Sequence, residues 1–348
     1  MKRISGSRRA RVRAVAALLT CVALVATTVA CTSGDDDQNQ VDVLTHASFS
    51  LPKSLIEQFD KDTGLTLNFI SSGDAGQLSS VVSLTPGSPK ADAVFGIDNT
   101  FAARPIAAGA LEPYRSPLAA DGADKYAVPG SDHELTAVDR GDVCINIDDA
   151  WYDREGVEPP KTLQDLAEPR YKNQAVLLDP ATSSPGMSFL LATIGTFQKK
   201  APDYWRSLMD NGAQVVSGWE TAYNQLFSAG EGHGAKPIVV SYASSPAATP
   251  GTSALLTGCF AQIEYIGVLK GAQNTKGAQK VIDWMLSPQV QAALPTSMFV
   301  YPVQNDIPMP ADWRQRAPAP QYTVSMSPQY INDHREEWLK EWRATVKR

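Results

Sequence analysis

The sequence predicts an α/β fold of two lobes with a ligand crevice between them. Strand-like apolar runs alternate with helical segments, the alternation repeats in the second half, and roughly 310 residues after the N-terminal segment suffice for two cores. Strand–helix–strand order with short connections indicates βαβ units and a mostly parallel sheet. Ligands of such sheets bind beyond the carboxyl ends of the strands, so we expect the crevice there.

The first half of the alternation is strand, helix, strand, helix, strand. In its first helix, Leu55, Ile56 and Phe59 share one face, and Gly64 follows as the C′ residue. The third strand is almost wholly apolar, as expected of a strand covered on both faces. The predicted strands are 41–49 (ending in a turn), 65–71 and 91–98, and the predicted helices are 50–64 and 76–84.

The second half repeats this pattern with longer helices. Its last segment is amphipathic, with Trp338, Leu339 and Trp342 on one side. The predicted strands are 143–148, 175–179, 213–218, 237–243 and 259–269. The predicted helices are 162–167, 183–197, 201–211, 219–232, one or two within 274–295, and 334–348.

The N-terminal segment predicts export. Six basic residues lie within 2–13, an apolar run of 14–30 follows, and Cys31 comes next. This order is typical of a secretory signal, and a cysteine after Val29–Ala30 resembles a bacterial lipobox, whose cysteine is lipidated. We therefore expect an extracytoplasmic protein, lipid-anchored to the outer face of the cell membrane. An ordinary cleaved signal or an uncleaved N-terminal anchor is the alternative.

These observations divide the chain into five parts. We expect a signal peptide at 1–30, a lipidated tether at 31–40, a first lobe at 41–137 plus about 265–302, a second lobe at 138–264, and a C-terminal helical segment at 303–348.

Charge and cysteine content narrow the function. Without residues 1–30 the formal net charge falls from −6 to −12, because six positive charges and no acid leave. Such a chain repels nucleic acid and suits a cationic or neutral small ligand. The four histidines are scattered and no C-x-x-C spacing occurs, so we expect no metal. Cys144 and Cys259 both begin strand-like runs and are candidates for one disulfide, with two buried thiols as the alternative.

Enzyme motifs are missing from the sequence. It contains no G-x-S-x-G, P-loop or H-E-x-x-H motif, and no G-x-G-x-x-G follows the first strand. No base stands near the serines of SSPGMS, and His233 lies in a glycine-rich turn where we expect it to be solvated. Nothing assembles a nucleophile, a base and an oxyanion hole, so we expect a binding protein and no enzyme.

Loops rich in hydroxyls, glycine and aromatic residues recur at the strand ends. Helix starts and hydroxyls bind polar ligand groups, and aromatic faces bind flat or cationic ones. Trp219 follows a glycine at a strand end and is expected in the site, whereas Tyr223, one turn later, is expected in the core. These loops are 71–76, 179–186, 217–223 and 241–246.

In order and spacing, the series GDAG, FGIDNT, DPATSSPGMS, SGWETAYNQLFSAGEG, IVVSYASSPA and LPTSMFVYPV resembles the substrate-binding proteins of thiamine ABC transporters. The similarity runs from about Val41 to Arg348. It implies a two-lobed periplasmic-binding-protein-like fold of type 2 that closes around thiamine or its phosphates and presents the ligand to ABC permease subunits. We expect a monomer without a cofactor.

The ligand contacts of that family carry over in part. The resemblance implies that the Asp74 carboxylate accepts from an aminopyrimidine amine, that Trp219 and Tyr242 cover a thiazolium, and that serines bind the hydroxyethyl or phosphate end. His46 and Phe299 stand where other aromatic residues are common. The implied ligand-binding residues are His46, Asp74, Ala75, Ser183, Ser184, Trp219, Tyr242, Ala243, Ser244, Ser245 and Phe299.

Departures from the family pattern leave other ligands open. Ala248 replaces an aromatic residue, which is compatible with another small cationic solute such as a polyamine, a pyrimidine or a metal complex. Ferric iron usually needs a tyrosine pair, and no Tyr-Tyr occurs. An extracytoplasmic enzyme acting on thiamine-like compounds is the remaining alternative, and Cys144 is the only cysteine that could serve it as nucleophile.

Overall fold

The computed structural model describes residues 39–346, which lie within one compact unit of the chain. The predicted signal peptide and the predicted lipidation of Cys31 lie outside these residues. Within them, none of the helices combines the length and the apolar character that a membrane crossing requires.

One mixed sheet runs through the described residues, with strand order β2-β1-β3-β9-β5-β8-β6-β7. β2, β1 and β3 pair parallel at one end, and β8, β6 and β7 pair parallel at the other. Between them, the β3–β9, β9–β5 and β5–β8 pairs are antiparallel. The expected parallel pairing of βαβ units is confirmed within each lobe. It is wrong at the centre, where β9 and β5 pair antiparallel with each other and with β3 and β8.

The strands are β1 Gln40–Thr45, β2 Thr66–Ser71, β3 Ala93–Asp98, β4 Leu111–Glu112, β5 Thr136–Asp148, β6 Ala175–Leu178, β7 Gln214–Val216, β8 Ile238–Tyr242, β9 Thr252–Leu269, β10 Tyr301–Pro302 and β11 Thr323–Val324. The α-helices are α1 Lys53–Thr63, α2 Ala75–Leu84, α3 Ala103–Ala107, α4 Asp149–Glu155, α5 Ser184–Phe197, α6 Ala201–Asp210, α7 Ser245–Ala248, α8 Thr275–Met285, α9 Pro288–Ser297, α10 Trp313–Arg316 and α11 Pro328–Val346.

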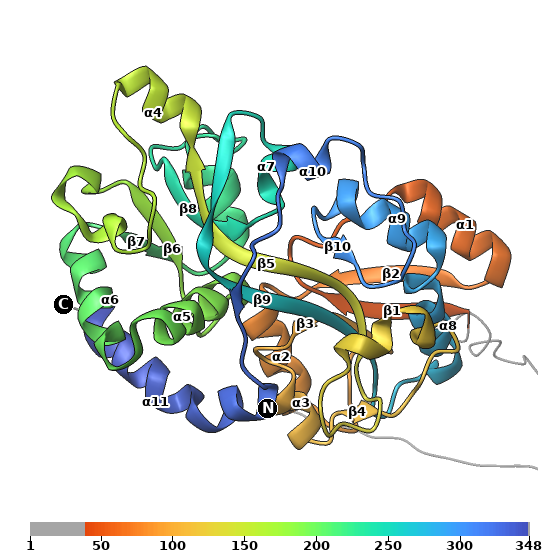
Figure 1. Ribbon diagram of the computed structural model, residues 1–348. Helices are drawn as coiled ribbons and strands as arrows, with labels where there is room; N and C mark the ends of the chain where they lie inside the picture. The colour runs from red at the N-terminus through yellow and green to blue at the C-terminus, as the bar shows by residue number, and fades with distance from the viewer. Residues whose placement is uncertain (1–38, 347–348) are drawn as a thin grey trace, which may run out of the picture. The chain divides into compact units, whose positions relative to one another are not determined.

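Two long strands join the two lobes of this fold. Figure 1 shows β5 and β9 running side by side between the lobe built on β1, β2 and β3 and the lobe built on β6, β7 and β8. β9 pairs with β3 through 264–268, whereas β5 pairs with β8 through 143–147. The two lobe boundaries proposed from the sequence fall inside these shared strands.

Local sequence signals explain several element ends. Gly64 closes α1 at φ 70°, a left-handed conformation that costs glycine little. Asp74 and Gln77 form a capping box at the start of α2. The hydroxyl of Ser183 accepts from the backbone N–H of Gly186 and so caps α5.

Two predicted helices are shorter than expected. The segment 162–167 contains only a 3₁₀ turn, Asp165–Ala167. The Asp165 carboxylate accepts from the backbone N–H groups of Lys161 and Thr162. The segment 219–232 contains a π-helical stretch, Glu220–Leu226. It ends where Phe227 pairs with Lys236 and the following glycines turn the chain back against it.

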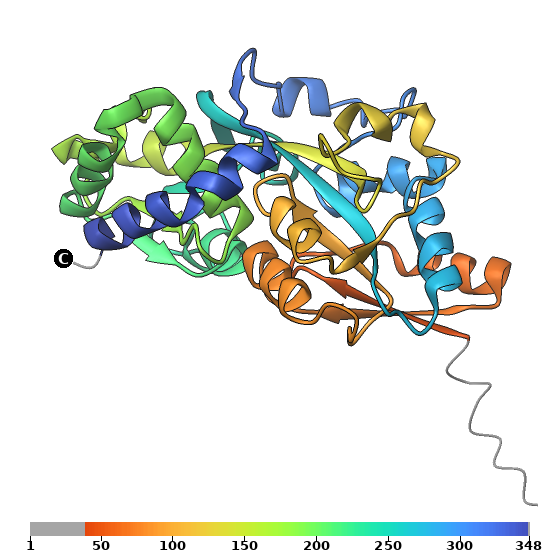
Figure 2. The same ribbon diagram turned by 90° about the horizontal axis from the view of Figure 1, so that it is seen from below.

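Two further features tie distant segments together. Cys144 and Cys259 form a disulfide between β5 and β9, in a small buried cluster with Ala243. The C-terminal helix α11 begins earlier than predicted and contacts both α6 and α3, lying across the two lobes in Figure 2. Its Trp342 meets Trp205 of α6 at 5.6 Å between ring centroids, and its Arg335 donates to the carbonyl of Thr100 at 3.0 Å.

Candidate functional site

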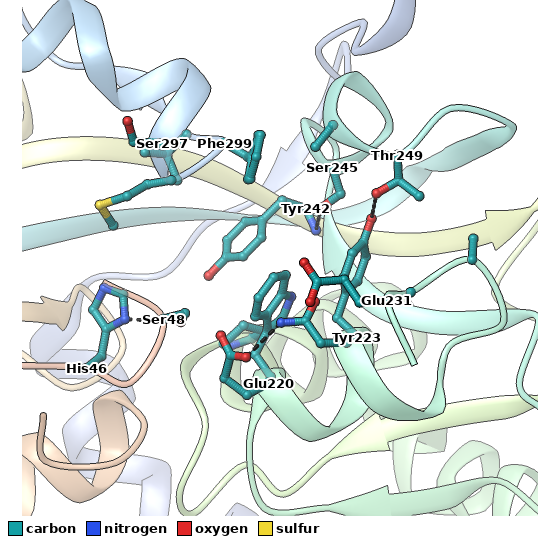
Figure 3. Close-up of a pocket in the computed structure, with 18 of the residues that line it drawn as sticks. His46, Ser48, Glu220, Tyr223, Glu231, Tyr242, Ser245, Thr249, Ser297 and Phe299 are labelled. Carbon is teal, nitrogen blue, oxygen red and sulfur yellow. Dashed lines mark hydrogen bonds between the residues drawn. The ribbon is translucent and has the colours of Figure 1, made fainter. Parts of the chain in front are cut away.

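A cavity of about 540 Å³ lies between the two lobes and is drawn in Figure 3. Its size is within the range of small-molecule sites. Residues from the β1–α1 connection, the N-cap of α2, β9, the end of α9 and the α9–β10 connection face residues of the second lobe across it. The lining comprises His46, Ser48, Asp74, Ser184, Pro185, Trp219, Glu220, Tyr223, Asn224, Ala229, Gly230, Glu231, His233, Tyr242, Ser245, Ala248, Thr249, Pro250, Glu264, Ser297, Met298, Phe299 and Val300.

Aromatic rings form the wall contributed by the second lobe. Trp219 stacks on Tyr223, with 4.8 Å between the ring centroids and 12° between the planes. The indole N–H donates to the hydroxyl of Ser241 at 2.9 Å, and the Tyr223 hydroxyl donates to Thr249 at 2.9 Å. These bonds hold both rings in place, so the wall offers a preformed aromatic face.

Tyr242 extends this wall toward the first lobe. Its ring lies against Gly141 of β5, where an added Cβ would come within 2.8 Å of the ring. Its hydroxyl accepts from Gln262 of β9 at 3.2 Å, and burial raises its pKa. Figure 3 shows Tyr242 between His46 on one side and Tyr223 with Thr249 on the other. A flat ligand in the cavity can therefore contact rings along much of its length.

The charges that line the cavity are negative. Four carboxylic residues, Asp74, Glu220, Glu231 and Glu264, reach it, and none of its described lining residues is a lysine or an arginine. The Glu220 carboxylate accepts from Asn224 at 2.7 Å. Carboxylates beside aromatic faces favour a cationic ligand, because both attract positive charge.

Asp74 bridges the two lobes. One carboxylate oxygen, Oδ1, accepts from the backbone N–H of Ala75 at 2.7 Å, and Oδ2 accepts from the backbone N–H of Trp219 at 3.1 Å. Glycine at position 218 keeps this approach open, since a Cβ there would lie 3.2 Å from Oδ2. Asp74 is therefore both a helix cap and the residue that positions Trp219.

His46 and Glu264 lie together on the first-lobe side of the cavity. His46 Nδ1 is 3.2 Å from the Ser48 hydroxyl, and Nε2 is 3.7 Å from Glu264 Oε1. Burial lowers the pKa of His46 to about 4 despite the nearby charges of Asp74 and Glu220. The imidazole is therefore neutral at pH 7 and does not form an ion pair. Gly96, at φ 100°, leaves room for the ring, because a Cβ there would lie 2.1 Å from it.

Buried carboxyl groups surround Glu264. Burial, reinforced by the Asp74 charge, raises the pKa of Glu264 to about 7. Asp139 faces Glu264 in the β5–β9 register, and burial together with the Glu264 charge raises the Asp139 pKa. Burial likewise raises the pKa of Asp98 to about 7, although Ser184 and Thr100 donate hydroxyl protons to it.

The structure places seven of the residues predicted for the site in the cavity lining, and these are His46, Asp74, Ser184, Trp219, Tyr242, Ser245 and Phe299. Four others do not line it. Ala75 and Ala243 are fully buried. Ser183 caps α5, and Ser244 donates to the carbonyl of Phe299. Local sequence places these four next to site residues, but their side chains point into the protein.

Sequence reasoning missed the cavity acids other than Asp74. A lone acid in the apolar run of β9 was the available signal for Glu264, because a buried strand does not usually carry one. Tyr223 is buried, as expected of a core residue, and it also faces the cavity. His233 is exposed, as expected, and stands on the cavity lining with Glu231 from the same turn.

A two-lobed α/β fold with a ligand-sized cavity between the lobes defines a periplasmic-binding type of protein. The chain belongs to the family of bacterial extracellular solute-binding proteins, whose pattern matches residues 88–324. In the described part of the chain, no group of three or more His, Cys, Asp or Glu side chains could hold a metal ion.

Individual relatives are similar over most of the chain. The thiamine-binding periplasmic protein of Salmonella typhimurium is 29% identical over 306 residues, covering 83% of this chain and 87% of its own. That of Escherichia coli K12 is 28% identical over 321 residues, covering 88% and 93%. A solved periplasmic thiamin binding protein superimposes with a TM-score of 0.78 at 26% identity, covering 89% of this chain and 96% of its own.

Proposed function

We propose that this chain captures thiamine outside the cytoplasm and delivers it to an ABC importer. The observation that carries the proposal is the stacked aromatic wall of Trp219 and Tyr223 beside four carboxylic residues, in a lining without lysine or arginine among its described residues. The relatives named as thiamine-binding proteins support it.

Thiamine matches this chemistry in each of its parts. Its aminopyrimidine is flat and donates through an exocyclic amine, and its thiazolium carries a permanent positive charge. Rings such as those of Trp219 and Tyr242 attract a cation by about 0.5–2 kcal/mol each. Asp74 and Glu264 supply the acceptor oxygens that an amine needs.

The N-terminal segment completes the proposal. A signal peptide at 1–30 would direct export, and a lipidated Cys31 would hold the binding unit at the outer face of the membrane, near ABC permease subunits. One acyl chain gives only marginal binding, so stable anchoring implies more than one chain on the cysteine. The segment 31–40 would then act as a tether, and we expect the monomer to be the working form.

Calorimetric titration tests whether thiamine is the ligand of this cavity. Thiamine should bind the wild-type chain at one site, and Trp219→Ala should weaken binding about 10- to 100-fold, through lost ring contact and cation attraction. Trp219→Phe keeps a ring and should retain most of the affinity. Trp338→Ala, on α11, is the matched control and should bind as the wild type does.

Two outcomes would overturn the proposal. Saturable binding of spermidine without binding of thiamine would assign the cavity to another cationic solute. Turnover of thiamine, followed by absorbance, would assign the protein to the enzymes.

A further inference from the structure

We infer that Asp139 is a positioning residue of the cavity: it keeps its proton and donates it in a hydrogen bond to Glu264, so that the pair presents one negative charge to a bound cation. The inference rests on the proposed function, since it explains how the site holds a charge that attracts thiamine. Asp139 does not line the cavity itself. It acts through Glu264, whose side chain does.

A β-bulge in β5 brings the two acids together. Ala137 of β5 pairs with Tyr265 of β9. Asp139, the next paired residue of β5, lies opposite Glu264, the immediate neighbour of Tyr265. Side chains alternate between the two faces of a strand, and the extra residue, Val138, breaks this alternation. Asp139 therefore lies on the face of Glu264 instead of the face of Ala137.

The surroundings of Asp139 favour its neutral form. The side chain is fully buried, and neither carboxylate oxygen has a hydrogen-bond donor among the described residues. The guanidinium of the next residue, Arg140, lies over the ring of Tyr301 at 4.9 Å from the centroid, and its charge acts on Asp142. An ionised Asp139 would be a buried charge without a partner, which is costly. Burial, together with the Glu264 charge, raises the pKa of Asp139 well above its usual value.

Glu264 is the better place for the negative charge of the pair. Its Oε1 accepts from the side-chain amide of Gln262 at 3.4 Å, and it faces the cavity. Burial raises the pKa of Glu264 to about 7, the hydrogen bond from Asp139 opposes this rise, and the charge of Asp74 adds to it. Above about pH 7 the pair therefore holds one proton and one negative charge.

The described groups around Glu264 do not neutralise this charge. His46 Nε2 lies 3.7 Å from Glu264, but burial lowers the pKa of the imidazole to about 4, so it is neutral. Burial raises the pKa of Tyr242, which is therefore neutral as well. The other acids whose charges reach Glu264 are Asp74 and Asp98, and neither can balance it. A cation bound in the cavity supplies the missing countercharge.

Calorimetric titration with thiamine at pH 6 and pH 8 tests the inference. Asp139→Asn keeps the shape and always carries a donor for Glu264, so its affinity should stay within about twofold of the wild type at both pH values. Asp139→Leu has a similar size and no donor. At pH 8 its affinity should be about tenfold lower, because the Glu264 carboxylate loses a hydrogen bond and its pKa rises. Asp142→Asn removes an acid of the same strand outside the cavity, and should bind as the wild type does.

A double-variant cycle shows whether Asp139 acts through Glu264. In a Glu264→Gln chain, Asp139→Leu should change the affinity by less than about threefold, because the charge that Asp139 supports is gone. A loss of about tenfold in that chain as well would show that leucine disturbs the structure. This result would overturn the positioning role.

Infrared spectroscopy of the chain without ligand tests the proton independently of thiamine. At about pH 8.5, where ordinary carboxylic acids are ionised, the carbonyl band of a protonated carboxylic acid should be present in the wild type and absent from Asp139→Asn. Absence of this band from the wild type would overturn the inference and leave the proposed function standing. An equal loss of affinity in Asp139→Asn and Asp139→Leu would do the same. Failure of the wild-type chain to bind thiamine would reject the proposed function, and with it the role of the pair toward a cation.

Discussion

Asp74 combines two roles at the scale of a single side chain. Its Oδ1 caps α2 and its Oδ2 holds the backbone N–H of Trp219 in the other lobe. Asparagine has one acceptor oxygen and can serve only one of these contacts, while its NH₂ group would face the other N–H. Replacing Asp74 by asparagine therefore removes one of its two hydrogen bonds although the two side chains have nearly the same shape.

We predict that Asp74→Asn weakens thiamine binding by about 2–3 kcal/mol, because a charge-assisted bond to Trp219 is lost and the negative charge leaves the cavity. Isothermal titration calorimetry measures the effect. Asp165→Asn, at an exposed turn with similar backbone bonds, is the control and should bind normally. Wild-type affinity with lowered thermal stability would show that Asp74 only caps its helix.

Single residues differ in how far the sequence could predict them. The place of Trp219 and Tyr242 in the cavity lining was predictable, because aromatic residues in loops at strand ends are seldom needed for core packing. Glu231 was not, because a charged residue in a glycine-rich turn is most often solvated. Ser183 and Ser244 were assigned to the ligand because they match the motifs of the family that the sequence resembles. In the structure the Ser183 hydroxyl caps α5 and the Ser244 hydroxyl donates to a carbonyl.

At the scale of elements, the spacing of apolar residues predicted α1 and α11. The alternation of apolar runs with helical segments predicted α5, α6, α8 and the main strands. Strand direction was predictable within each lobe, where strand–helix–strand order gives parallel pairs. It was not predictable for β5 and β9, because parallel and antiparallel strands carry the same apolar side chains. The π-helical stretch after Trp219 was also beyond prediction, since its residues have ordinary helical preferences.

The disulfide gives a prediction for the β5–β9 pair. Cys144 and Cys259 close a loop with a sequence separation of 115, and a link of that length lowers the entropy of the unfolded chain by about 4–5 kcal/mol in the entropic description. Replacing both cysteines by alanine should lower the free energy of unfolding in urea by about 2–5 kcal/mol. Alkylation of the unfolded, non-reduced chain from Thr32 onward should add no groups. Two added groups would show free thiols.

At the scale of the whole described unit, contacts between the lobes complete the site. The backbone N–H of Gly76 donates to the carbonyl of Thr182 at 3.0 Å, beside the bond from Ser184 to Asp98. Ser184 and Asp98 are 86 residues apart in sequence, so local sequence patterns could not predict this hydrogen bond. The cavity is therefore a property of the closed arrangement, in which each lobe supplies acceptors or donors to the other.

The buried acids also make the stability of this arrangement depend on pH. Burial raises the pKa of both Asp98 and Glu264 to about 7, so the folded chain binds more protons than the unfolded chain from about pH 4 to about pH 7. Their contribution to the free energy of unfolding is therefore present at low pH and is lost as the pH rises through about 7. His46 has the opposite effect between about pH 4 and 6.5, because its imidazole is neutral in the folded chain and protonated in the unfolded chain. Its contribution to the free energy of unfolding therefore rises with pH in this interval.

Thiamine binding should strengthen as the pH rises from 6 to 8. In this interval Glu264 loses its proton, and the carboxylate that results faces a cavity without lysine or arginine among its described lining residues. A bound cation stabilises the charged form and lowers the pKa of Glu264, so binding releases a proton and affinity rises about fivefold across the interval. Calorimetry in buffers of different ionisation enthalpy measures both the affinity and the released proton. Glu264→Gln should flatten the profile, whereas Glu337→Gln, outside the cavity, should not. A rise of the same size in the Glu264→Gln chain would assign the titrating group elsewhere.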